Sequence, residues 1–335
     1  MARRVRWGVL GVASIAVRRA IPGMRKGEWC EIAAIASRDL GKAQQAAKAL
    51  GVPQACGSYD ELLADPTIEA IYNPLPNTLH VPWTKRAAEA GKHVLCEKPI
   101  GVSAADAESL IGVRDRTGVK IEEAFMVRTH PRWLRTRELI RSGRIGELRV
   151  VSISVSYFNR DPHNIRNSIE YRGGALLDIG CYPVTLSRFL FGAEPARVVA
   201  LIERDPEMKT DRVTSAILEF PSGRAVFTCS TQVAYDQRVS ILGTIGKIEI
   251  ERPLNPPNDQ PTRISIDDTP GDPTGGGVTT ERIPACDQFT IQGDLFSRAI
   301  REGGEVAVPL EDSVRNMRVI DAIFRSAESG RWETP

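Results

Sequence analysis

The sequence predicts an α/β domain with a parallel sheet, followed by an α+β domain with a large, mostly antiparallel open sheet. In the first third, short β-branched runs alternate with helix-like stretches. After about Phe125, long strands with alternating apolar residues follow one another. The 335 residues also exceed the size at which one hydrophobic core normally stops growing. We therefore predict two domains, residues 1–125 and 126–335.

The first domain is predicted from a repeated order of strand, helix and strand, which is typical of parallel strands joined by crossover helices. Strands are expected at residues 4–10, 31–37, 70–73, 92–96 and 120–124. Helices are expected at residues 16–24, 41–50, 59–64, 78–90 and 104–116. Ser103 is the expected N-cap of the last helix, and Gly118 is its stop signal.

The second domain is predicted from longer strands and fewer helices. Strands are expected at residues 148–158, 196–203, 213–220, 225–233 and 237–250. Helices are expected at residues 132–141, 175–191, 287–301 and 310–329. The segment 253–280 is rich in Pro, Gly, Asp and Thr, which predicts a long surface loop with at most a short strand at 263–266.

Charge and cysteine usage exclude several classes of protein. The net charge is +2, and acidic and basic residues are interleaved, so we expect no nucleic-acid partner. The six cysteines are scattered and form no C-x-x-C pair, which argues against a zinc or redox site and predicts no metal. Residues 5–13 contain Arg6 and two glycines, unlike a signal peptide, and no apolar run reaches transmembrane length. We expect a cytoplasmic protein with no membrane partner.

A glycine pattern follows the first predicted strand and opens a helix. Gly8 and Gly11 allow a tight turn and a close approach of backbone amides to a pyrophosphate, while Ala13 is small enough for helix and strand to pack closely. Ser14 and Ile15 lie in the same turn. This context predicts a Rossmann dinucleotide-binding domain. Two glycines at such a position are also compatible with a plain turn.

The end of the second strand indicates which nicotinamide cofactor fits. An acidic side chain there would bind the adenosine ribose and repel a 2′-phosphate. Here Ser37 and Arg38 follow the strand, and Lys42 lies one helical turn further, so hydroxyl and cationic groups suit a phosphate. The pattern favours NADP over NAD. The alternative is that Arg38 is a solvated loop residue and Asp39 holds the ribose.

One predicted strand ends in Glu97-Lys98-Pro99, and this is the most specific of several motifs in the chain. Further motifs lie at residues 74–80, 123–126, 164–166, 173–182 and 308–322. Together, and in this order, they resemble the Gfo/Idh/MocA oxidoreductase family, in the branch that includes glucose-fructose oxidoreductase, D-xylose dehydrogenase and dimeric dihydrodiol dehydrogenase. The resemblance therefore spans nearly the full length.

The resemblance implies a fold and a set of cofactor contacts. The family has an N-terminal Rossmann domain and an α+β domain whose open sheet covers the nicotinamide and often forms an oligomer contact. It therefore implies a homodimer or homotetramer through the C-terminal sheet. The positions that it implies on the cofactor side are Pro74, Leu75, Asn77, His80, Glu97, Lys98 and Arg166.

The expected chemistry needs a group that takes a proton from a hydroxyl while hydride leaves for the nicotinamide. Tyr182 is a candidate, because a nearby cation such as Lys98 would stabilise its phenolate. Asp178 lies four residues before Tyr182 on a predicted helix, so both are expected on one face, where Asp178 would orient the substrate hydroxyl.

Each assignment has a structural alternative. Lys98 could be a solvated charge at a strand end, Tyr182 a packed aromatic, and Asp178 a charge that the helix dipole stabilises. His80 could be structural, and Arg166 and His130 could be surface charges. His93 and His163 offer no functional argument.

These observations predict an NADP-dependent oxidoreductase acting on a sugar-like hydroxyl or carbonyl, with an aldose of the xylose or glucose type as leading substrate. Tyr182 occupies a position where many relatives have histidine, so the resemblance implies pyranoses or dihydrodiols rather than inositols. Alternatives are a trans-dihydrodiol dehydrogenase, an anhydrofructose-type ketone reductase, or a sugar-sugar oxidoreductase that retains its cofactor. A regulator that senses NADP without catalysis is an alternative of another class.

Overall fold

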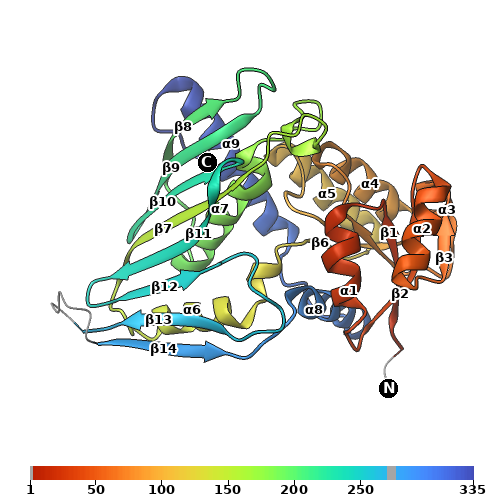
Figure 1. The fold of residues 1–335 in the computed structure, drawn as a ribbon, viewed down its shortest axis with the longest axis horizontal. Coiled ribbons are helices and arrows are strands. Elements are labelled where there is room, and N and C mark those ends of the chain that lie inside the picture. The colour runs from red at the N-terminus through yellow and green to blue at the C-terminus, as the bar shows by residue number, and fades with distance from the viewer. Residues whose placement is uncertain (1–2, 270–276) are drawn as a thin grey trace. The chain divides into compact units, whose positions relative to one another are not determined.

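The structure, a computed structural model, describes residues 3–269 and 277–335. The chain divides into two compact units (Figure 1). Unit 1 comprises Met1–Thr129 and Asp287–Val314, and unit 2 comprises His130–Cys286 and Arg315–Pro335. This division differs from the expected boundary after residue 125, because a late segment of the chain packs with unit 1.

Unit 1 contains a six-stranded sheet in which all neighbouring strands are parallel. Its strands are β1 (Val5–Leu10), β2 (Cys30–Ala36), β3 (Gln54–Cys56), β4 (Ala70–Asn73), β5 (His93–Cys96) and β6 (Ile121–Glu123). Their order in the sheet is β3-β2-β1-β4-β5-β6. The predicted parallel α/β fold is confirmed. The strand β3 was not predicted, because it is too short to show a periodic pattern.

Most helices of unit 1 lie between these strands in the sequence, while η2 follows β6 and α8 comes from a late segment of the chain. They are η1 (Ala16–Ala20), α1 (Ile21–Met24), α2 (Leu40–Leu50), α3 (Tyr59–Ala64), α4 (Asn77–Glu89), α5 (Ala104–Thr117), η2 (Met126–Arg128) and α8 (Gln288–Glu302). The Ser103 hydroxyl accepts a hydrogen bond from the Asp106 amide at 3.2 Å, and Gly118 ends α5 in the left-handed conformation. Both predicted capping signals are therefore confirmed.

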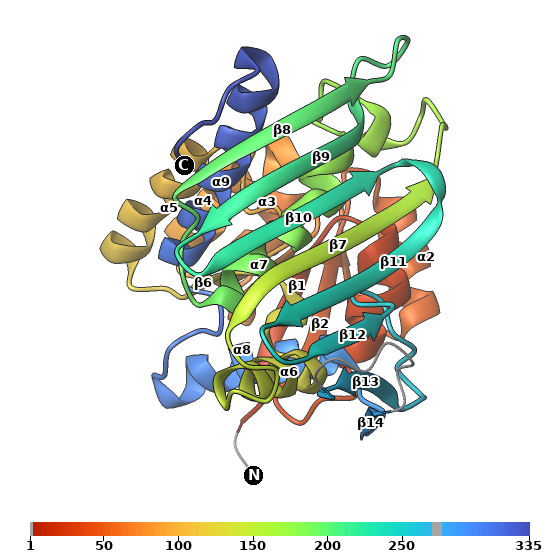
Figure 2. The ribbon, with the colours of Figure 1, turned by 90° about the vertical axis from the view of Figure 1, so that its left-hand side faces the viewer.

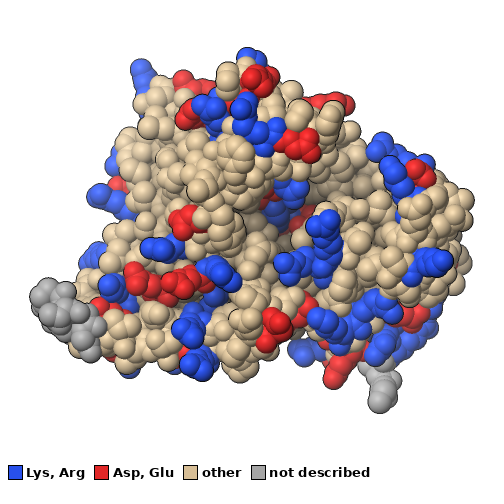
Figure 3. All heavy atoms as spheres, in the orientation of Figure 1, with Lys and Arg blue, Asp and Glu red and all other residues tan. Residues whose placement is uncertain are grey.

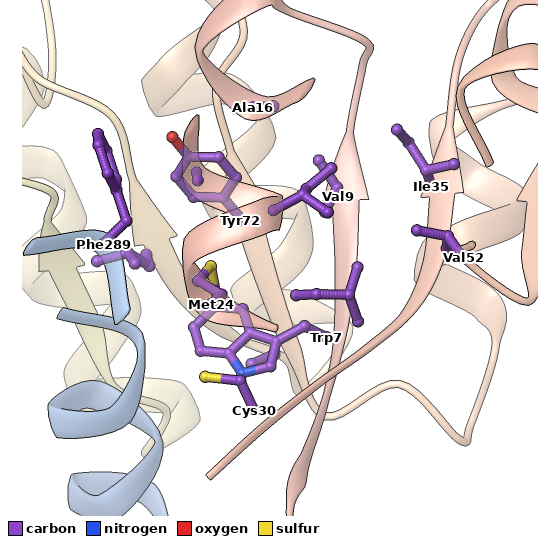
Figure 4. Close-up of a cluster of buried hydrophobic side chains, with 14 of the residues drawn as sticks. Trp7, Val9, Ala16, Met24, Cys30, Ile35, Val52, Tyr72 and Phe289 are labelled. Carbon is purple, nitrogen blue, oxygen red and sulfur yellow. The ribbon is translucent and has the colours of Figure 1, made fainter. Parts of the chain in front are cut away.

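The core of unit 1 explains why α8 belongs to it. Trp7 of β1 is fully buried, its indole N–H donates to the Ser297 hydroxyl at 3.0 Å, and its ring lies 5.5 Å from the ring of Phe296. In Figure 4, Phe289 of α8 reaches the same cluster as Met24 of α1. Because α8 buries this aromatic face against β1 and α1, it is part of the Rossmann unit rather than of the second domain.

Two of the predicted helices begin with a wider, π-helical turn. Ala16–Ala20 is such a turn and precedes Pro22, while Leu176–Gly180 is another and precedes Pro183. Proline has no N–H to donate, and its ring clashes with the carbonyl four residues earlier in a regular α-helix. A widened turn before each proline relieves this conflict, and such turns are frequent at functional sites.

Unit 2 contains an eight-stranded sheet with the order β14-β13-β12-β11-β7-β10-β9-β8. Among the described strands, β7 and β10 pair in parallel and the other pairings are antiparallel, which confirms the predicted, mostly antiparallel sheet. The strands are β7 (Leu148–Phe158), β8 (Arg197–Arg204), β9 (Asp211–Phe220), β10 (Gly223–Ser230), β11 (Gln232–Gly243), β12 (Lys247–Glu251), β13 (Thr262–Asp267) and β14 (Val278–Ile283).

Three strand predictions in unit 2 were wrong in their extent. The single strand expected at 237–250 is two strands, because a turn at 244–246 reverses the chain and the Gly243 amide donates to the Gly246 carbonyl at 2.8 Å. The strand expected at 225–233 ends at Ser230, and a new strand starts at Gln232. The segment 253–280 forms β13 and the start of β14, while residues 270–276 lie outside the described residues.

Helices cover one face of this sheet. They are α6 (Pro131–Arg141), η4 (Leu176–Gly180), α7 (Cys181–Phe191) and the end of α9 (Leu310–Ser329), and a further short helix, η3 (Ile165–Asn167), precedes η4 in the chain. Figure 2 shows the other face of the strands toward the viewer, with no described helix in front of it. Residues on β10 alternate between buried and exposed, which fits one covered and one open face.

The surface of the described chain shows both charge signs. Figure 3 shows Lys and Arg interspersed with Asp and Glu over the visible face. Within the described residues, no helix is both long and apolar enough to cross a lipid bilayer. Nor do residues 3–269 and 277–335 contain a group of three or more His, Cys, Asp or Glu side chains placed to hold a metal ion.

Candidate active site

The strand order of unit 1 creates a switch point at the carboxyl ends of β1 and β4. Chain connections run in opposite directions from these neighbouring strands, and ligands of open α/β sheets bind in the crevice outside such ends. Candidate cofactor-binding residues are therefore expected in the loops after Leu10 and Asn73.

Gly11 and Gly8 serve different purposes. Gly11 has φ +82°, a conformation that disfavours side chains, and its amide donates to the Ala36 carbonyl at 2.8 Å. A Cβ at Gly11 would lie 3.1 Å from the Leu75 side chain and 3.5 Å from the Tyr59 hydroxyl. Gly8 instead lies inside β1, where a Cβ would approach Leu62 to 2.9 Å. Gly11 thus shapes the turn, whereas Gly8 allows β1 to pack against α3.

The rest of the glycine loop leads into η1. Ala13 and Ile15 are partly buried against the core of unit 1, whereas the Ser14 side chain is exposed. The Ala13 carbonyl accepts the Val17 amide at 3.0 Å, which starts the helical hydrogen bonding. Backbone amides before this point have no helical partners and are suited to an anion such as a pyrophosphate.

At the end of β2, polar groups gather beside Gly11. The Ser37 side chain is 8% exposed, and its hydroxyl accepts the Asp39 amide at 3.2 Å. The exposed Arg38 side chain interacts with the Tyr59 hydroxyl; burial raises the pKa of Tyr59, and the Arg38 charge offsets part of that effect. Asp39 is the N-cap of α2, where it accepts the Lys42 amide at 3.1 Å, and the Lys42 ammonium lies 4.0 Å from its carboxylate.

The loop after β4 is fixed by the buried Asn73. Its side-chain amide donates to the His80 carbonyl at 3.0 Å and to the Thr84 hydroxyl at 3.1 Å. Its oxygen accepts the Leu75 amide at 3.4 Å. Pro74 is buried, and Asn77 is the partly buried first residue of α4. Asn73 was not singled out from the sequence, although it stands at the end of a predicted strand.

His80 is a link between two loops. Its side chain is 1% exposed, with Nδ1 2.7 Å from the Pro99 carbonyl oxygen and Nε2 2.6 Å from the Leu75 carbonyl oxygen. Burial lowers the pKa of His80 to about 4, which outweighs the opposite effect of the two carbonyls. Since both ring nitrogens face backbone oxygens, His80 positions the loops rather than extending toward a ligand.

The Glu97 carboxylate accepts a hydrogen bond from a side chain of a neighbouring strand. The Tyr72 hydroxyl of β4 donates to Glu97 Oε1 at 2.5 Å, and the Lys98 amide donates to Oε2 at 3.3 Å. The Glu97 side chain is buried, whereas Lys98 is partly buried at the carboxyl end of β5. Tyr72 was not singled out from the sequence, because nothing in its local pattern distinguishes it from a core tyrosine.

In unit 2, Asp178 accepts hydrogen bonds from Tyr157 and Arg166. The Tyr157 hydroxyl of β7 donates to Oδ2 at 2.6 Å, and Arg166 Nε donates to Oδ1 at 2.9 Å. The Asp178 side chain is only 10% exposed. Arg166 was expected on the cofactor side, and the structure places its guanidinium against Asp178. Tyr157 was not singled out from the sequence, because alternation along β7 indicates only that it lies in a strand.

The turn that carries Asp178 is anchored by β9. The buried Asp211 carboxylate accepts the Leu176 amide at 2.6 Å and the Thr214 hydroxyl at 3.3 Å. Burial raises the pKa of Asp211 to about 6. Gly174 has φ +123°, and a Cβ there would lie 1.9 Å from an Asp211 carboxylate oxygen. Gly174 therefore allows the chain to approach Asp211.

Tyr182 lies in the first turn of α7 and is 5% exposed. It follows Asp178 by four residues, but Asp178 lies in the π-helical turn, so their relative direction differs from that in a regular α-helix. Lys98 belongs to unit 1 and Tyr182 to unit 2. Their expected juxtaposition stays a prediction.

The remaining histidines have structural surroundings or are exposed. His130 Nδ1 accepts the Arg132 amide at 3.0 Å, and burial lowers the pKa of His130 to about 4. His93 Nδ1 accepts the Lys120 amide at 2.9 Å. His163 is exposed.

Two family models match the chain over most of its length. An oxidoreductase family with an NAD-binding Rossmann fold matches residues 5–125. The GFO/IDH/MocA C-terminal domain matches residues 133–249.

Similar proteins cover the chain almost completely. An uncharacterised oxidoreductase of Rhizobium meliloti is 47% identical over 98% of this chain and 99% of its own length. A D-xylose 1-dehydrogenase (NADP(+)) of Haloferax volcanii is 37% identical over 97% of this chain and 98% of its own. Among solved structures, a 3-ketoreductase from Actinomadura kijaniata in complex with NADP and TDP-benzene superposes with a TM-score of 0.90 at 31% identity, over 97% and 98% of the two chains.

Proposed function

The chain belongs to the Gfo/Idh/MocA family of oxidoreductases, and we propose that it is an NADP-dependent dehydrogenase of a sugar-like substrate, with an aldose of the xylose or glucose type as its leading candidate. The observation that carries the proposal is the Asp178 carboxylate, held as a hydrogen-bond acceptor by Tyr157 and Arg166 four residues before Tyr182. A fixed acceptor beside a proton-transfer group suits a substrate with several hydroxyls.

The residues at the end of β2 fit the phosphate of NADP. Gly11 has a positive φ in the turn after β1, where its lack of a side chain leaves room for a bound nucleotide. The exposed Arg38 lies beside Tyr59 at the same edge of the sheet. Asp39, the residue that could repel a phosphate, uses its carboxylate to cap α2. Arg38 and Ser37 therefore favour NADP over NAD, as do the NADP-linked names of the similar proteins.

When bound, NADP supplies the acceptor for a hydride. The protein must then take the hydroxyl proton at the same carbon. We assign the removal of that proton to Tyr182 in its phenolate form, which the Lys98 ammonium would stabilise and which becomes a phenol when it accepts the proton. Glu97 holds the Lys98 backbone through the hydrogen bond at 3.3 Å, and Asp178 would accept a hydrogen bond from the substrate.

Reduction of a sugar ketone is the second candidate. The specific observation in its favour is the similarity to the Actinomadura kijaniata 3-ketoreductase over 97% of this chain. The same Tyr182 and Lys98 would then deliver a proton instead of removing one, because the reaction is reversible at that point. Oxidation of a trans-dihydrodiol needs the same groups.

One assay separates these candidates. Purified protein is mixed with NADP or NAD and a panel of aldoses, polyols and dihydrodiols, while reduction of the cofactor is followed at 340 nm. The reverse reaction is followed with NADPH and keto sugars. We expect NADP reduction with an aldose. If folded protein binds NADP but turns over no member of either panel, the regulatory alternative replaces the enzymatic one.

We further propose a homodimer or homotetramer that joins through the open face of the eight-stranded sheet. Leu201 is 78% exposed on β8, and Val226 and Leu242 are exposed on β10 and β11. Alternate residues on these strands are buried on the helix-covered side, so these three apolar side chains share the open face. A second copy of the chain is the occupant that we propose for this face.

A further inference from the structure

A cysteine, a histidine and an arginine of unit 2 form a cluster that the proposed reaction does not use. Cys286 follows β14, and its Sγ lies 3.6 Å from Nε2 of His130, the residue that caps α6. Arg132 is the second residue of that helix. Cys286 is partly exposed, whereas the other five cysteines of the sequence, all of which the structure describes, are buried. A small reagent in solution can therefore reach this thiol in the folded protein, unlike the buried ones.

The ring proton of His130 is directed at the sulfur. His130 Nδ1 accepts the Arg132 amide at 3.0 Å. Burial, with a smaller effect from the Arg132 charge, lowers the pKa of His130 to about 4, so its imidazole is neutral at pH 7. A neutral imidazole has one N–H, and since Nδ1 is an acceptor, that N–H is at Nε2. Nε2 therefore donates to Cys286 Sγ, which favours the thiolate over the thiol.

Arg132 supplies a buried positive charge to the same cluster. The residue is 2% exposed, and its guanidinium donates at 3.0, 2.9 and 3.2 Å to the backbone carbonyls of Glu251, Arg252 and Pro253. Within residues 3–269 and 277–335, its acceptors include no carboxylate, and its Nε has no hydrogen-bond partner. Burial lowers the pKa of Arg132 to about 10, and a negative charge on Cys286 opposes this effect. Since carbonyl dipoles do not cancel a full charge, the guanidinium stabilises a thiolate at Cys286.

The adjacent acid, Asp287, is compensated by other partners. Its carboxylate lies 3.1 Å from the Lys26 ammonium and accepts the Phe289 amide at 3.1 Å at the start of α8. A carboxylate that is already paired and hydrogen-bonded opposes a nearby thiolate less than a bare one does. The groups around the Cys286 sulfur therefore favour its ionised, nucleophilic form.

We propose that Cys286 is a reactive thiol, activated by His130 and Arg132, which a hydroperoxide oxidises to a sulfenic acid. The thiolate sulfur attacks one peroxide oxygen, so that an S–O bond forms and the O–O bond breaks, and the departing hydroxide takes up a proton and leaves as water. The sulfur loses two electrons and the peroxide gains them. This modification site is independent of the proposed dehydrogenase reaction, in which none of the three residues has a role.

Alkylation measures the activation of the thiol directly. Wild-type protein is treated with iodoacetamide at pH 7, either folded or in concentrated urea, and the rate at each cysteine is read by peptide mass spectrometry. In urea, Cys286 loses its neighbours and reacts as an ordinary thiol. We expect Cys286 to react about 10-fold faster in the folded protein, because more of it is thiolate, whereas the buried cysteines react more slowly than in urea. A folded rate equal to or below the rate in urea would overturn the activation.

Two histidine variants test the source of the activation. Asparagine caps helices well but is shorter than histidine, so His130→Asn keeps a cap for α6 and removes the donor to the sulfur. We expect the alkylation rate of Cys286 to fall by about 5-fold in this variant. His163→Asn, at an exposed histidine of the same unit, is the matched control and is expected to keep the wild-type rate. A wild-type rate in His130→Asn would rule out the imidazole as the activating donor.

Peroxide tests the modification itself. The protein is exposed to hydrogen peroxide in the presence of dimedone, which traps sulfenic acids, and the adducts are located by peptide mass spectrometry. We expect one adduct per chain, at Cys286, and none in Cys286→Ser. Fast alkylation without a dimedone adduct, or adducts spread over the other cysteines, would overturn the oxidation site. These readouts need no sugar substrate, so they stand or fall separately from the proposed function.

Discussion

The Tyr72 hydroxyl and the Glu97 carboxylate form a 2.5 Å hydrogen bond between the ends of two neighbouring parallel strands, β4 and β5. Both side chains are buried, at 1% and 9% exposure, so water does not compete for this bond. Glu97 also accepts the amide of Lys98. The backbone that presents the proposed catalytic lysine is thus held by a side chain from the adjacent strand.

Removal of the Tyr72 hydroxyl tests this support. In Tyr72→Phe, the buried Glu97 loses a donor while the ring that packs in the core is kept. We expect the free energy of unfolding to fall by about 1–3 kcal/mol, as for other hydrogen bonds to buried charged groups. Urea unfolding at pH 7 measures it, with Tyr235→Phe as the control. An unchanged midpoint would show that Glu97 finds another donor.

Lys98→Ala tests the catalytic assignment. The ammonium is expected to stabilise the Tyr182 phenolate, so its loss should lower kcat by at least about 1000-fold, whereas NADP binding remains measurable. Cofactor reduction and NADP titration give the two readouts. Lys85→Ala, at another partly buried lysine of unit 1, is expected to retain activity. Near-normal turnover by Lys98→Ala would rule out the proposed role.

Arg38→Ala tests the choice of cofactor. A guanidinium that binds a phosphate through charge-assisted hydrogen bonds should contribute on the order of 1.5–3 kcal/mol. We therefore expect the KM for NADP to rise about 10- to 100-fold and that for NAD to change little. The exposed Lys48, on the same helix as Lys42, provides the control variant Lys48→Ala. If the KM values for NADP and NAD changed by the same factor, a residue other than Arg38 would distinguish the two cofactors at the ribose.

Glu122→Gln tests a buried carboxyl that the proposed reaction does not use. Glu122 is 1% exposed on β6, accepts the Ala307 amide at 3.3 Å, and has its pKa raised by burial from 4.5 to about 8. The folded state therefore holds the proton more tightly than the unfolded state. The contribution of Glu122 to the free energy of unfolding is therefore fully present below about pH 4.5 and is lost as pH rises through 8.

Glutamine keeps the shape but does not titrate. Between pH 7 and pH 9, the unfolding free energy of the wild-type protein is expected to fall by about 1.4 kcal/mol more than that of Glu122→Gln. Urea unfolding at the two pH values measures this difference. Parallel pH dependence in the two proteins would mean that Glu122 is ionised in the folded state at neutral pH.

Leu201→Lys tests the proposed oligomer contact. An ammonium on the open face of the sheet would have to be desolvated in an interface between copies, so we expect dissociation toward monomers. Light scattering coupled to size exclusion measures the mass. Leu295→Lys, at an exposed leucine of α8 in unit 1, is the control and is expected to leave the mass unchanged. A wild-type monomer would refute the contact directly.

The sequence by itself determined the family, the enzyme class and the two-part fold class, and the family match and the two sheets confirm these predictions. Local signals were sufficient because periodicity, the Ser103 cap and motifs such as Glu97-Lys98-Pro99 depend on neighbouring residues. The nucleotide-binding turn was predicted for the same reason. The short β3 and the turn at 244–246 were missed, because three-residue elements carry too little pattern.

Only the tertiary structure decided which side chains from distant segments meet. Tyr72 and Glu97 are 25 residues apart, Tyr157 and Asp178 are 21 apart, and Trp7 and Ser297 are 290 apart. Each pair forms because a buried donor or acceptor must find a partner when water is excluded, wherever along the chain that partner lies. The sequence could supply the chemical types of these residues, but their pairing depends on how sheets and helices pack.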